Sequence, residues 1–196
     1  MSEIIGIPEI FFVTTNLNKY RELNVIFNQF SSFKLKHVQK SLIEIQSLDL
    51  EEIATFSLKK FSRTSQIEPV FVEDSGLFID KLNGFPGPYS AYVYKTLGLR
   101  GILNLMQEIR NRKAYFQSSI ALKIENSIEI FTERVNGTIS NRISNSGWGY
   151  DPIFIPEKEN GQTFGELGSK KNRISHRFLA ALKLIKFLKK FIYLAD

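Results

Sequence analysis

The sequence of 196 residues contains no cysteine, two histidines and a single tryptophan. The absence of cysteine excludes disulfide bonds, thiolate metal sites and a cysteine nucleophile, and it is typical of proteins in a reducing cytosol. His37 and His176 lie far apart in the sequence, so a histidine-rich zinc site is not expected. The chain also lacks a basic leader and any apolar run of membrane-spanning length. We therefore expect a soluble, cytoplasmic protein.

The charge is positive, because 26 lysines and arginines face 20 aspartates and glutamates, which gives a net charge of +6. This excess favours a polyanionic partner, either a nucleic acid or the phosphates of a nucleotide. A solvated, lysine-rich surface would give the same count, so charge alone does not decide between them. The length and the hydrophobic content of 43% are typical of one globular domain, which we expect to span residues 1–196.

The segment 71–77 reads Phe-Val-Glu-Asp-Ser-Gly-Leu, an apolar strand that runs into two adjacent carboxylates, Glu73 and Asp74. Successive side chains of a strand point to opposite faces, so the two acids cannot both face the core. We expect them at the carboxyl end of a buried strand, where open α/β sheets bind ligands. A strand stop made of turn formers explains the same residues. The Gly- and Pro-rich segment 83–90 is predicted to be a rigid loop beside the acids.

Residues 14–19 connect a short apolar strand, 10–13, to an amphipathic helix. A strand followed by a polar turn and a helix start can bind a phosphate through free backbone N–H groups and the helix dipole. The turn lacks the glycines of known phosphate loops. A helix cap at Asn16 or Asn18, with a solvated Lys19, is the simpler explanation of this segment alone.

A second basic cluster, residues 170–177, opens the last helix, with Ser175 as its predicted N-cap. The apolar stripe of this helix is predicted to be Phe178, Leu182, Ile185, Leu188 and Ile192, and its solvated face Lys183, Lys186, Lys189 and Lys190. His176 and Arg177 would then lie in the first turn, where the helix dipole disfavours cations, so an anionic or polar ligand is expected nearby. Before this cluster, Trp148 lies between two glycines in the loop 144–152. An aromatic ring on such a loop favours stacking on a flat ligand over a packing role.

Periodicity predicts helices at 50–64, 91–97 and 101–110, a strand at 34–38, and a hairpin of strands 114–124 and 127–135. Residues 137–139 read as a further short strand or turn. Glu44 lies among apolar neighbours and is either on the wet side of an edge strand or held for a cation. Lys59, near the end of its helix, needs no functional explanation by itself, because a cation there favours the helix dipole.

Together these segments supply a phosphate cradle, carboxylates for a metal ion, an aromatic loop for a base and a second basic cluster. That combination suits a nucleoside triphosphate bound through Mg²⁺, a hard cation that prefers carboxylate and phosphate oxygens. Phosphoryl-group chemistry depends on positioning and charge stabilisation, so the missing cysteine is no obstacle.

In this order, from about residue 10 to residue 180, the motifs resemble those of the inosine/xanthosine triphosphate pyrophosphatases. The matching segments are Thr14-Thr15-Asn16 with Lys19, Glu44-Ile45-Gln46, Glu73-Asp74-Ser75-Gly76, Asn83-Gly84-Phe85-Pro86-Gly87 with Tyr89-Ser90, Gly149-Tyr150-Asp151-Pro152-Ile153-Phe154, Thr163 with Glu166-Leu167, and Lys171-Asn172 with Ser175-His176-Arg177. Several motifs in family order are far more specific than any one of them.

The resemblance implies hydrolysis of ITP, dITP and XTP to the monophosphate and pyrophosphate, with Mg²⁺ as cofactor and usually in a homodimer. It also implies an α/β fold that is elongated and two-lobed. Such a fold has a long twisted mixed sheet flanked by helices and an active-site cleft between the lobes.

Carried over by residue, the resemblance implies that Asp74 is the general base and that Glu44, Glu73 and Asp74 surround the metal ion. The implied substrate-binding residues are Thr14, Thr15, Asn16, Lys19, Lys59 and Lys171 for the phosphates, and Ser75, Trp148, Gly149, Tyr150, Asp151, His176 and Arg177 around the rest of the nucleotide. A donor such as Arg177 matches the 6-keto oxygen of hypoxanthine or xanthine, whereas it faces the 6-amino group of adenine donor to donor.

One departure bears on phosphate binding. Ala91 and Tyr92 stand where the family usually has a lysine or arginine, and Lys95, one helical turn further on, is a candidate substitute. The alternatives to an enzyme are a nucleic-acid-binding module and a nucleotide-binding protein without turnover. Lysines that cluster at turns beside carboxylates argue against the first, and the intact pair of Glu73 and Asp74 argues against the second. We therefore expect neither a nucleic-acid nor a membrane partner.

Overall fold

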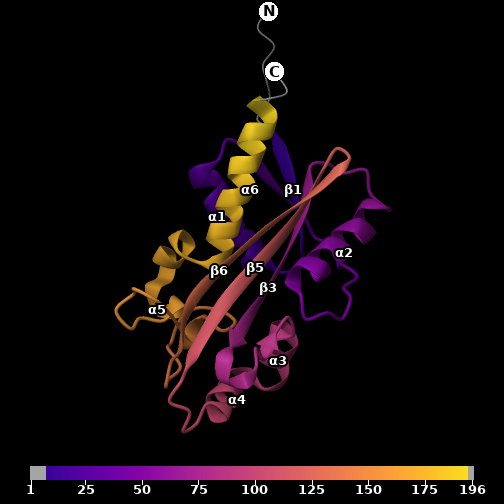
Figure 1. Cartoon of the computed structure of the whole chain (residues 1–196). Coiled ribbons are helices and arrows are strands. Elements are labelled where there is room, and N and C mark those ends of the chain that lie inside the picture. Colours follow the sequence, from indigo (N-terminus) through magenta and orange to yellow (C-terminus); the bar gives the residue numbers. More distant parts are fainter. Residues whose placement is uncertain (1–7, 194–196) are drawn as a thin grey trace, which may run out of the picture.

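The computed structural model describes residues 8–193 as one mixed sheet flanked by helices, in an elongated molecule (Figure 1). The strands follow the order β2-β1-β3-β5-β6-β7, and β4 pairs with β3 outside this path. Their bounds are β1 Glu9–Val13, β2 Lys34–Val38, β3 Val70–Ile79, β4 Pro86–Gly87, β5 Lys113–Ile124, β6 Ser127–Ile139 and β7 Phe154–Pro156. β1 pairs in parallel with β2 and β3, and the other pairs are antiparallel. The predicted α/β class is confirmed.

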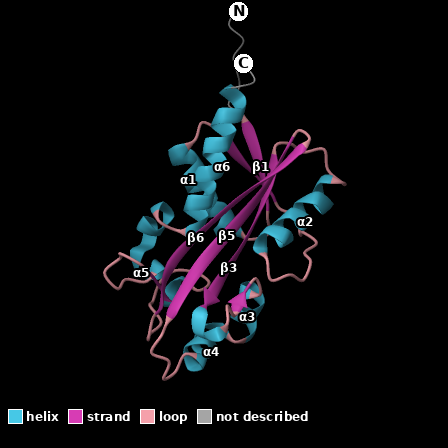
Figure 2. Cartoon of the chain, in the orientation of Figure 1, coloured by secondary structure: helices cyan, strands magenta, loops and turns pink. Residues whose placement is uncertain are grey.

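The helices lie around this sheet (Figure 2). Their bounds are α1 Leu17–Phe30, α2 Leu50–Ser62, α3 Ser90–Thr96, α4 Gly98–Leu105, α5 Phe164–Leu167 and α6 His176–Tyr193, with 3-10 turns η1 Asp80–Leu82, η2 Asp151–Ile153 and η3 Gly168–Arg173. In the described part of the chain, no helix has both the length and the apolar character needed to cross a membrane.

The prediction that a strand ends at the two acids is wrong. β3 pairs with β5 without a break, from Val70 opposite Lys123 to Ile79 opposite Ala114. Gly76 lies inside this strand because β4 comes very close: a Cβ at Gly76 would lie 2.3 Å from the carbonyl oxygen of Gly87. The glycine therefore permits a close approach within a sheet and does not make a turn. The segment 83–90, expected to hold no regular element, contributes β4.

Two other predicted boundaries differ from the structure. β6 continues to Ile139, so residues 137–139 extend the hairpin and do not form a separate strand or turn. The helix expected at 101–110 is α4, which ends at Leu105. Arg112 explains this end, because its Nη1 donates to the carbonyl of Met106 at 2.7 Å and so satisfies a group that a longer helix would have used.

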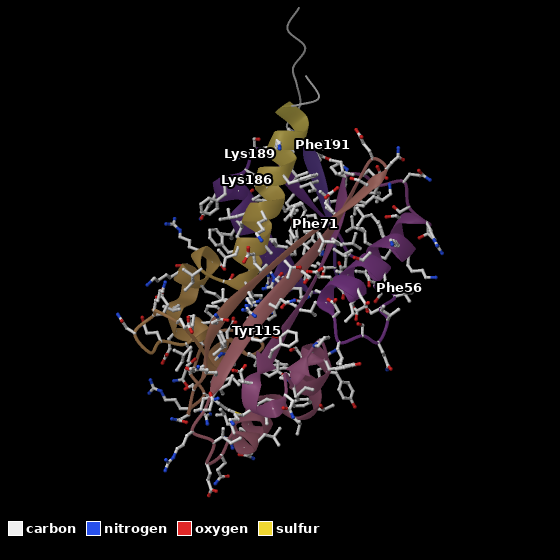
Figure 3. The ribbon with its side chains drawn as sticks, in the orientation of Figure 1. Phe56, Phe71, Tyr115, Lys186, Lys189 and Phe191 are labelled. Atoms are coloured by element: carbon white, nitrogen blue, oxygen red, sulfur yellow. The ribbon has the colours of Figure 1, made fainter. Side chains whose placement is uncertain are left out.

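The core has separate parts at the two ends of the sheet. At one end α1 and α6 pack against one face, where Phe71 stacks with Phe12 at a centroid distance of 4.8 Å, and α2 covers the other face. At the other end α3, α4 and α5 pack against the sheet around Phe116. Phe71, a residue of β3, is labelled in Figure 3.

The last helix follows its predicted pattern where its side chains are described. Phe178, Ile185 and Leu188 are buried, whereas Lys186 is exposed, as expected for the solvated face (Figure 3). The side chain of Ile192, which we also assigned to the apolar stripe, lies outside the described residues. Ser175 caps the helix as predicted, since its Oγ accepts from the backbone N–H of Phe178 at 3.2 Å.

Candidate active site

The edge of β3 is open between its two neighbours, and a cavity lies against this gap. β1 pairs with β3 as far as Phe71, and β4 resumes the pairing at Leu77. A cavity of about 670 Å³ adjoins the intervening residues and is lined by the β1–α1 turn, the loop after β2, α3, residues 148–151, η3 and the start of α6. A ligand in this cavity would therefore contact both ends of the molecule.

The structure brings nearly all the predicted site residues to this cavity. Those that line it are Thr14, Thr15, Asn16, Lys19, Glu44, Glu73, Asp74, Ser75, Trp148, Gly149, Tyr150, Asp151, Lys171, His176 and Arg177. Lys59 does not line it. Because Leu58 and Phe61 of α2 face the core, Lys59 is turned to solvent in the last turn of the helix. Glu44 is exposed in a loop, and not on an edge strand as one of our readings had it.

A second hollow, of about 590 Å³, lies beside α4 and contains Arg112. The guanidinium of Arg112 donates to the carbonyls of Met106, Ile139 and Ser140 at 2.7 to 2.8 Å. These bonds join the end of α4 to the end of β6, so Arg112 has a structural role and this hollow is not a candidate active site.

The start of α1 is capped and also contacts β3. The Oδ1 of Asn16 accepts from the backbone N–H groups of Asn18 and Lys19 at 3.0 and 3.2 Å, which confirms the predicted cap. Lys19 is not simply solvated, because its Nζ lies 3.0 Å from Oε2 of Glu73 and donates to the carbonyl oxygen of Glu73 at 3.2 Å. Lys19 thus bridges α1 and the open edge of β3.

Glu73 and Asp74 are neighbours on β3, both line the cavity, and they differ in acidity. Burial alone would raise the pKa of Glu73, but Arg177, Lys19 and a hydrogen bond from Ser118 outweigh it and hold this pKa well below the ordinary value. The Oγ of Ser118 donates to Oε1 of Glu73 at 2.6 Å. Burial raises the pKa of Asp74 to about 6 although Lys19 opposes the shift. At neutral pH both are ionised, and Asp74 is the better proton acceptor.

The raised pKa of Asp74 predicts how its replacement changes stability. The folded state binds this proton more tightly than the unfolded chain, so Asp74 favours folding below its ordinary pKa of 3.8, and that contribution is lost as the pH rises through about 6. In EDTA, the free energy of unfolding of Asp74→Asn minus that of the wild type should therefore increase by about 2 kcal/mol between pH 4 and pH 8. Urea unfolding at both pH values measures this, and a difference independent of pH would contradict it.

Sequence reasoning missed Glu22, a buried acid that contacts three side chains of the site. This buried residue of α1 accepts from Trp148 Nε1 at 2.8 Å, Lys171 Nζ at 2.6 Å and Arg177 Nη1 at 2.5 Å. Burial raises its pKa, but Arg177 and Lys171 outweigh this effect and the pKa lies below the ordinary value. The available signal was its place beside Leu23 and one turn before Ile26, on the buried face of α1.

Carboxylates of the chain itself surround Arg177, the cation in the first turn of α6. Arg177 is 2% exposed and lies 3.3 Å from Glu73 through its Nε, in addition to its bond to Glu22. Its Nη2 also donates to the Oγ of Ser75 at 2.9 Å. Internal carboxylates thus account for Arg177 at this helix end, where the sequence suggested a bound ligand.

The aromatic end of the cavity is held in place by the same network. Trp148 is half-buried, with Lys171 Nζ 4.9 Å from its ring centroid. Asp151 accepts from Lys171 at 2.7 Å and from the backbone N–H of Trp148 at 3.3 Å. Gly149, with φ of 59°, takes a backbone conformation that favours glycine. The indole is therefore positioned by contacts before any ligand arrives.

His176 is buried and stacks on Phe116 at a centroid distance of 4.6 Å. Burial lowers its pKa well below the ordinary value, with Arg177 and Lys171 adding to the effect, so the ring is neutral at pH 7. Its Nδ1 has no hydrogen-bond partner within the described residues. A buried ring nitrogen without a partner suits a polar edge of a ligand.

The carboxylates at the open edge of β3 suit a divalent cation. Oε2 of Glu73 is buried and is ion-paired with Lys19 Nζ at 3.0 Å, and Asp74 and Glu44 line the same cavity. No three His, Cys, Asp or Glu side chains converge as a complete metal site in this range. Mg²⁺ commonly needs only one or two carboxylates when substrate phosphates supply further oxygens, so the residues present fit.

Comparisons with known proteins find relatives along most of the chain. The sequence model of the Ham1 family matches residues 10–187. A dITP/XTP pyrophosphatase of Korarchaeum cryptofilum is 46% identical over 92% of this chain and 96% of the relative, and one of Hyperthermus butylicus is 42% identical over 93% and 95%. The solved structure of the Staphylococcus aureus Ham1 protein superposes with a TM-score of 0.78, at 28% identity, and covers 93% of this chain and 98% of that one.

Proposed function

This chain belongs to the Ham1 family, and we propose that it is a nucleoside triphosphate pyrophosphatase acting on the non-standard purine nucleotides ITP, dITP and XTP. One observation carries the proposal. The acids Glu73 and Asp74 lie side by side at an open strand edge, in a cavity that also contains Trp148. Cations hold Glu73 strongly acidic, whereas burial makes Asp74 the better base. Two acids with different roles beside an aromatic residue suit hydrolysis of a nucleotide.

The reaction adds water across the α–β phosphoanhydride bond. Asp74 takes the proton from a water molecule, the water oxygen forms the new bond to phosphorus, and pyrophosphate leaves with the electrons of the broken P–O bond. Lys19, at the open edge of β3, places a positive charge beside the developing phosphate charge. Glu44, Glu73 and Asp74 would hold Mg²⁺, which when bound neutralises phosphate charge and helps to orient the substrate.

The other end of the cavity would bind the purine. Trp148 would stack on the base, and His176, Arg177 and Asp151 would read its edge. The Nδ1 of His176 lacks a partner among the described residues, and Arg177 brings N–H donors to the same cavity. Adenine would place its 6-amino donor where the 6-keto oxygen is expected, and each unpaired buried group costs about 1–3 kcal/mol.

The resemblance also supports two additional proposals, that the protein is a homodimer and that it acts in the cytoplasm. Light scattering in solution tests the first, and imaging or fractionation of the producing cells tests the second. Neither is needed for the chemistry described above.

The test of the function is pyrophosphate release from ITP, dITP, XTP, GTP and ATP, each with Mg²⁺ and with EDTA. We expect turnover that requires Mg²⁺, with kcat/KM for ITP and XTP about 10²-fold above that for ATP, because two mispaired polar groups account for such a ratio. Binding of ITP without release of pyrophosphate would contradict the proposal and would indicate a nucleotide-binding protein without turnover.

A further inference from the structure

The inner cations of the cavity already have acidic partners. The ion pairs are Lys19 with Glu73, Lys171 with Glu22 and Asp151, and Arg177 with Glu22 and Glu73. Glu44 and Asp74 line the same space and add negative charge. A triphosphate brings several further negative charges, so the inner cations, whose charge is already balanced, would not by themselves neutralise it.

Two other lysines line the cavity and lack such partners. Lys40 and Lys95 are both exposed, and neither lies within ion-pair distance of a carboxylate in residues 8–193. Lys40 has one weak contact, since its Nζ lies 5.1 Å from the ring centroid of Phe61. Their charges are therefore available to an anion at little cost, because no internal ion pair must be broken.

The two lysines belong to different walls of the cavity. Lys40 stands two residues after the end of β2, on the side where β1 pairs with β3. Lys95 lies in the last turn of α3, which follows β4 on the other side of the gap. Ala91, four residues before Lys95, also lines the cavity, so this face of α3 is directed at it. An anion at the gap would thus lie between two unpaired cations.

We propose that Lys40 and Lys95 bind the β- and γ-phosphates of the substrate from two sides of the cavity, and hence the pyrophosphate that leaves. This assignment rests on the proposed function and deepens it. The resemblance assigned a phosphate-binding role to Lys59, which does not line the cavity. The proposal gives that role to two lysines that do. Exposed lysines usually belong to a solvated surface. Lys40 and Lys95 differ because both line the cavity and neither has an acidic partner in residues 8–193.

Calorimetric binding of pyrophosphate and of IMP, both with Mg²⁺, tests the assignment on Lys40→Gln, Lys95→Gln and the double variant. Each single change should weaken pyrophosphate binding about fivefold and the double change about 25-fold, as for partly exposed ion pairs. IMP binding should change less than twofold, because IMP lacks these phosphates. Lys34→Gln and Lys81→Gln, which remove exposed lysines that do not line the cavity, are the matched controls.

Several results would overturn the proposal. One is that the wild type does not detectably bind pyrophosphate. Another is that either single variant binds pyrophosphate as tightly as the wild type. The third is that the variants lose IMP binding and pyrophosphate binding equally. Because the binding assay needs no turnover, its result is separate from that of the proposed function. If the wild type fails to hydrolyse ITP but pyrophosphate binding depends on both lysines, the function fails and the phosphate site stands. In an active enzyme, both variants should raise KM for ITP while kcat changes less than twofold.

Discussion

Replacing Asp74 with asparagine should lower kcat for ITP by about 10²–10⁴-fold, the usual contribution of a general base. Asparagine keeps the size of the side chain but cannot accept a proton. Asp74 suits this role because burial raises its pKa to about 6, whereas Glu73 is held strongly acidic. Steady-state pyrophosphate release across a substrate series measures the effect, and KM should change far less than kcat.

The control for this experiment is Asp80→Asn, which removes an exposed acid from η1, outside the cavity, and should leave kcat within twofold. At saturating Mg²⁺, binding of a non-hydrolysable ITP analogue to Asp74→Asn should stay within about threefold of the wild type, because Asp74 acts on water more than on substrate. Near-normal turnover in Asp74→Asn would exclude Asp74 as the base. A rise in the stability of this variant relative to the wild type between pH 4 and pH 8, together with its loss of kcat, would show that ionisation of Asp74 costs stability at the site it serves.

Replacing Arg177 with methionine should lower the free energy of unfolding by about 3–5 kcal/mol, the usual cost of removing one member of a buried ion pair. Arg177 is 2% exposed and contacts both Glu22 and Glu73. Its loss would leave these carboxylates with less compensating charge in a buried site. Denaturant unfolding at pH 7 measures the loss.

The matched control is Lys183→Met, which breaks an exposed pair with Glu133 and should cost less than about 1 kcal/mol. The loss of unfolding free energy in Arg177→Met should also become smaller as the pH falls. Protonation then neutralises the carboxylates that the variant leaves buried without their cationic partner. An equally small effect of the two substitutions, or a deficit that does not depend on pH, would show that the buried network does not stabilise the fold.

The two predictions are linked by one physical feature, the network that joins α1, β3 and α6. It fixes Arg177 and Trp148 in place through Glu22, and it keeps Glu73 ionised at the open strand edge. A site whose groups are already oriented loses less conformational entropy when a ligand binds. The network therefore contributes both to stability and to the arrangement of the cavity.

The sequence by itself determined the elements whose causes are local. The apolar alternation from 114 to 124 predicted β5, and the apolar stripe containing Phe178 and Leu188 predicted α6. The sequence predicted a helix cap at Ser175 and one at Asn16 or Asn18, because a cap bonds to backbone groups only two or three residues away; the structure places the second at Asn16. Nearly every residue that the motif order assigned to the site lines the cavity, although the order could not place these residues together in space.

Only the tertiary structure decided where β3 ends, which lysines reach the cavity and what Glu22 contacts. The length of β3 depends on its pairing with β5, and Gly76 reads as a turn until the close approach of β4 is known. The partners of Glu22 are 126 to 155 residues away, so its burial as a charged group cannot be inferred from its neighbours in α1. The physical reason is the same throughout. Helix periodicity and capping act over a few residues, whereas strand pairing and compensation of buried charge act between segments that only the fold brings together.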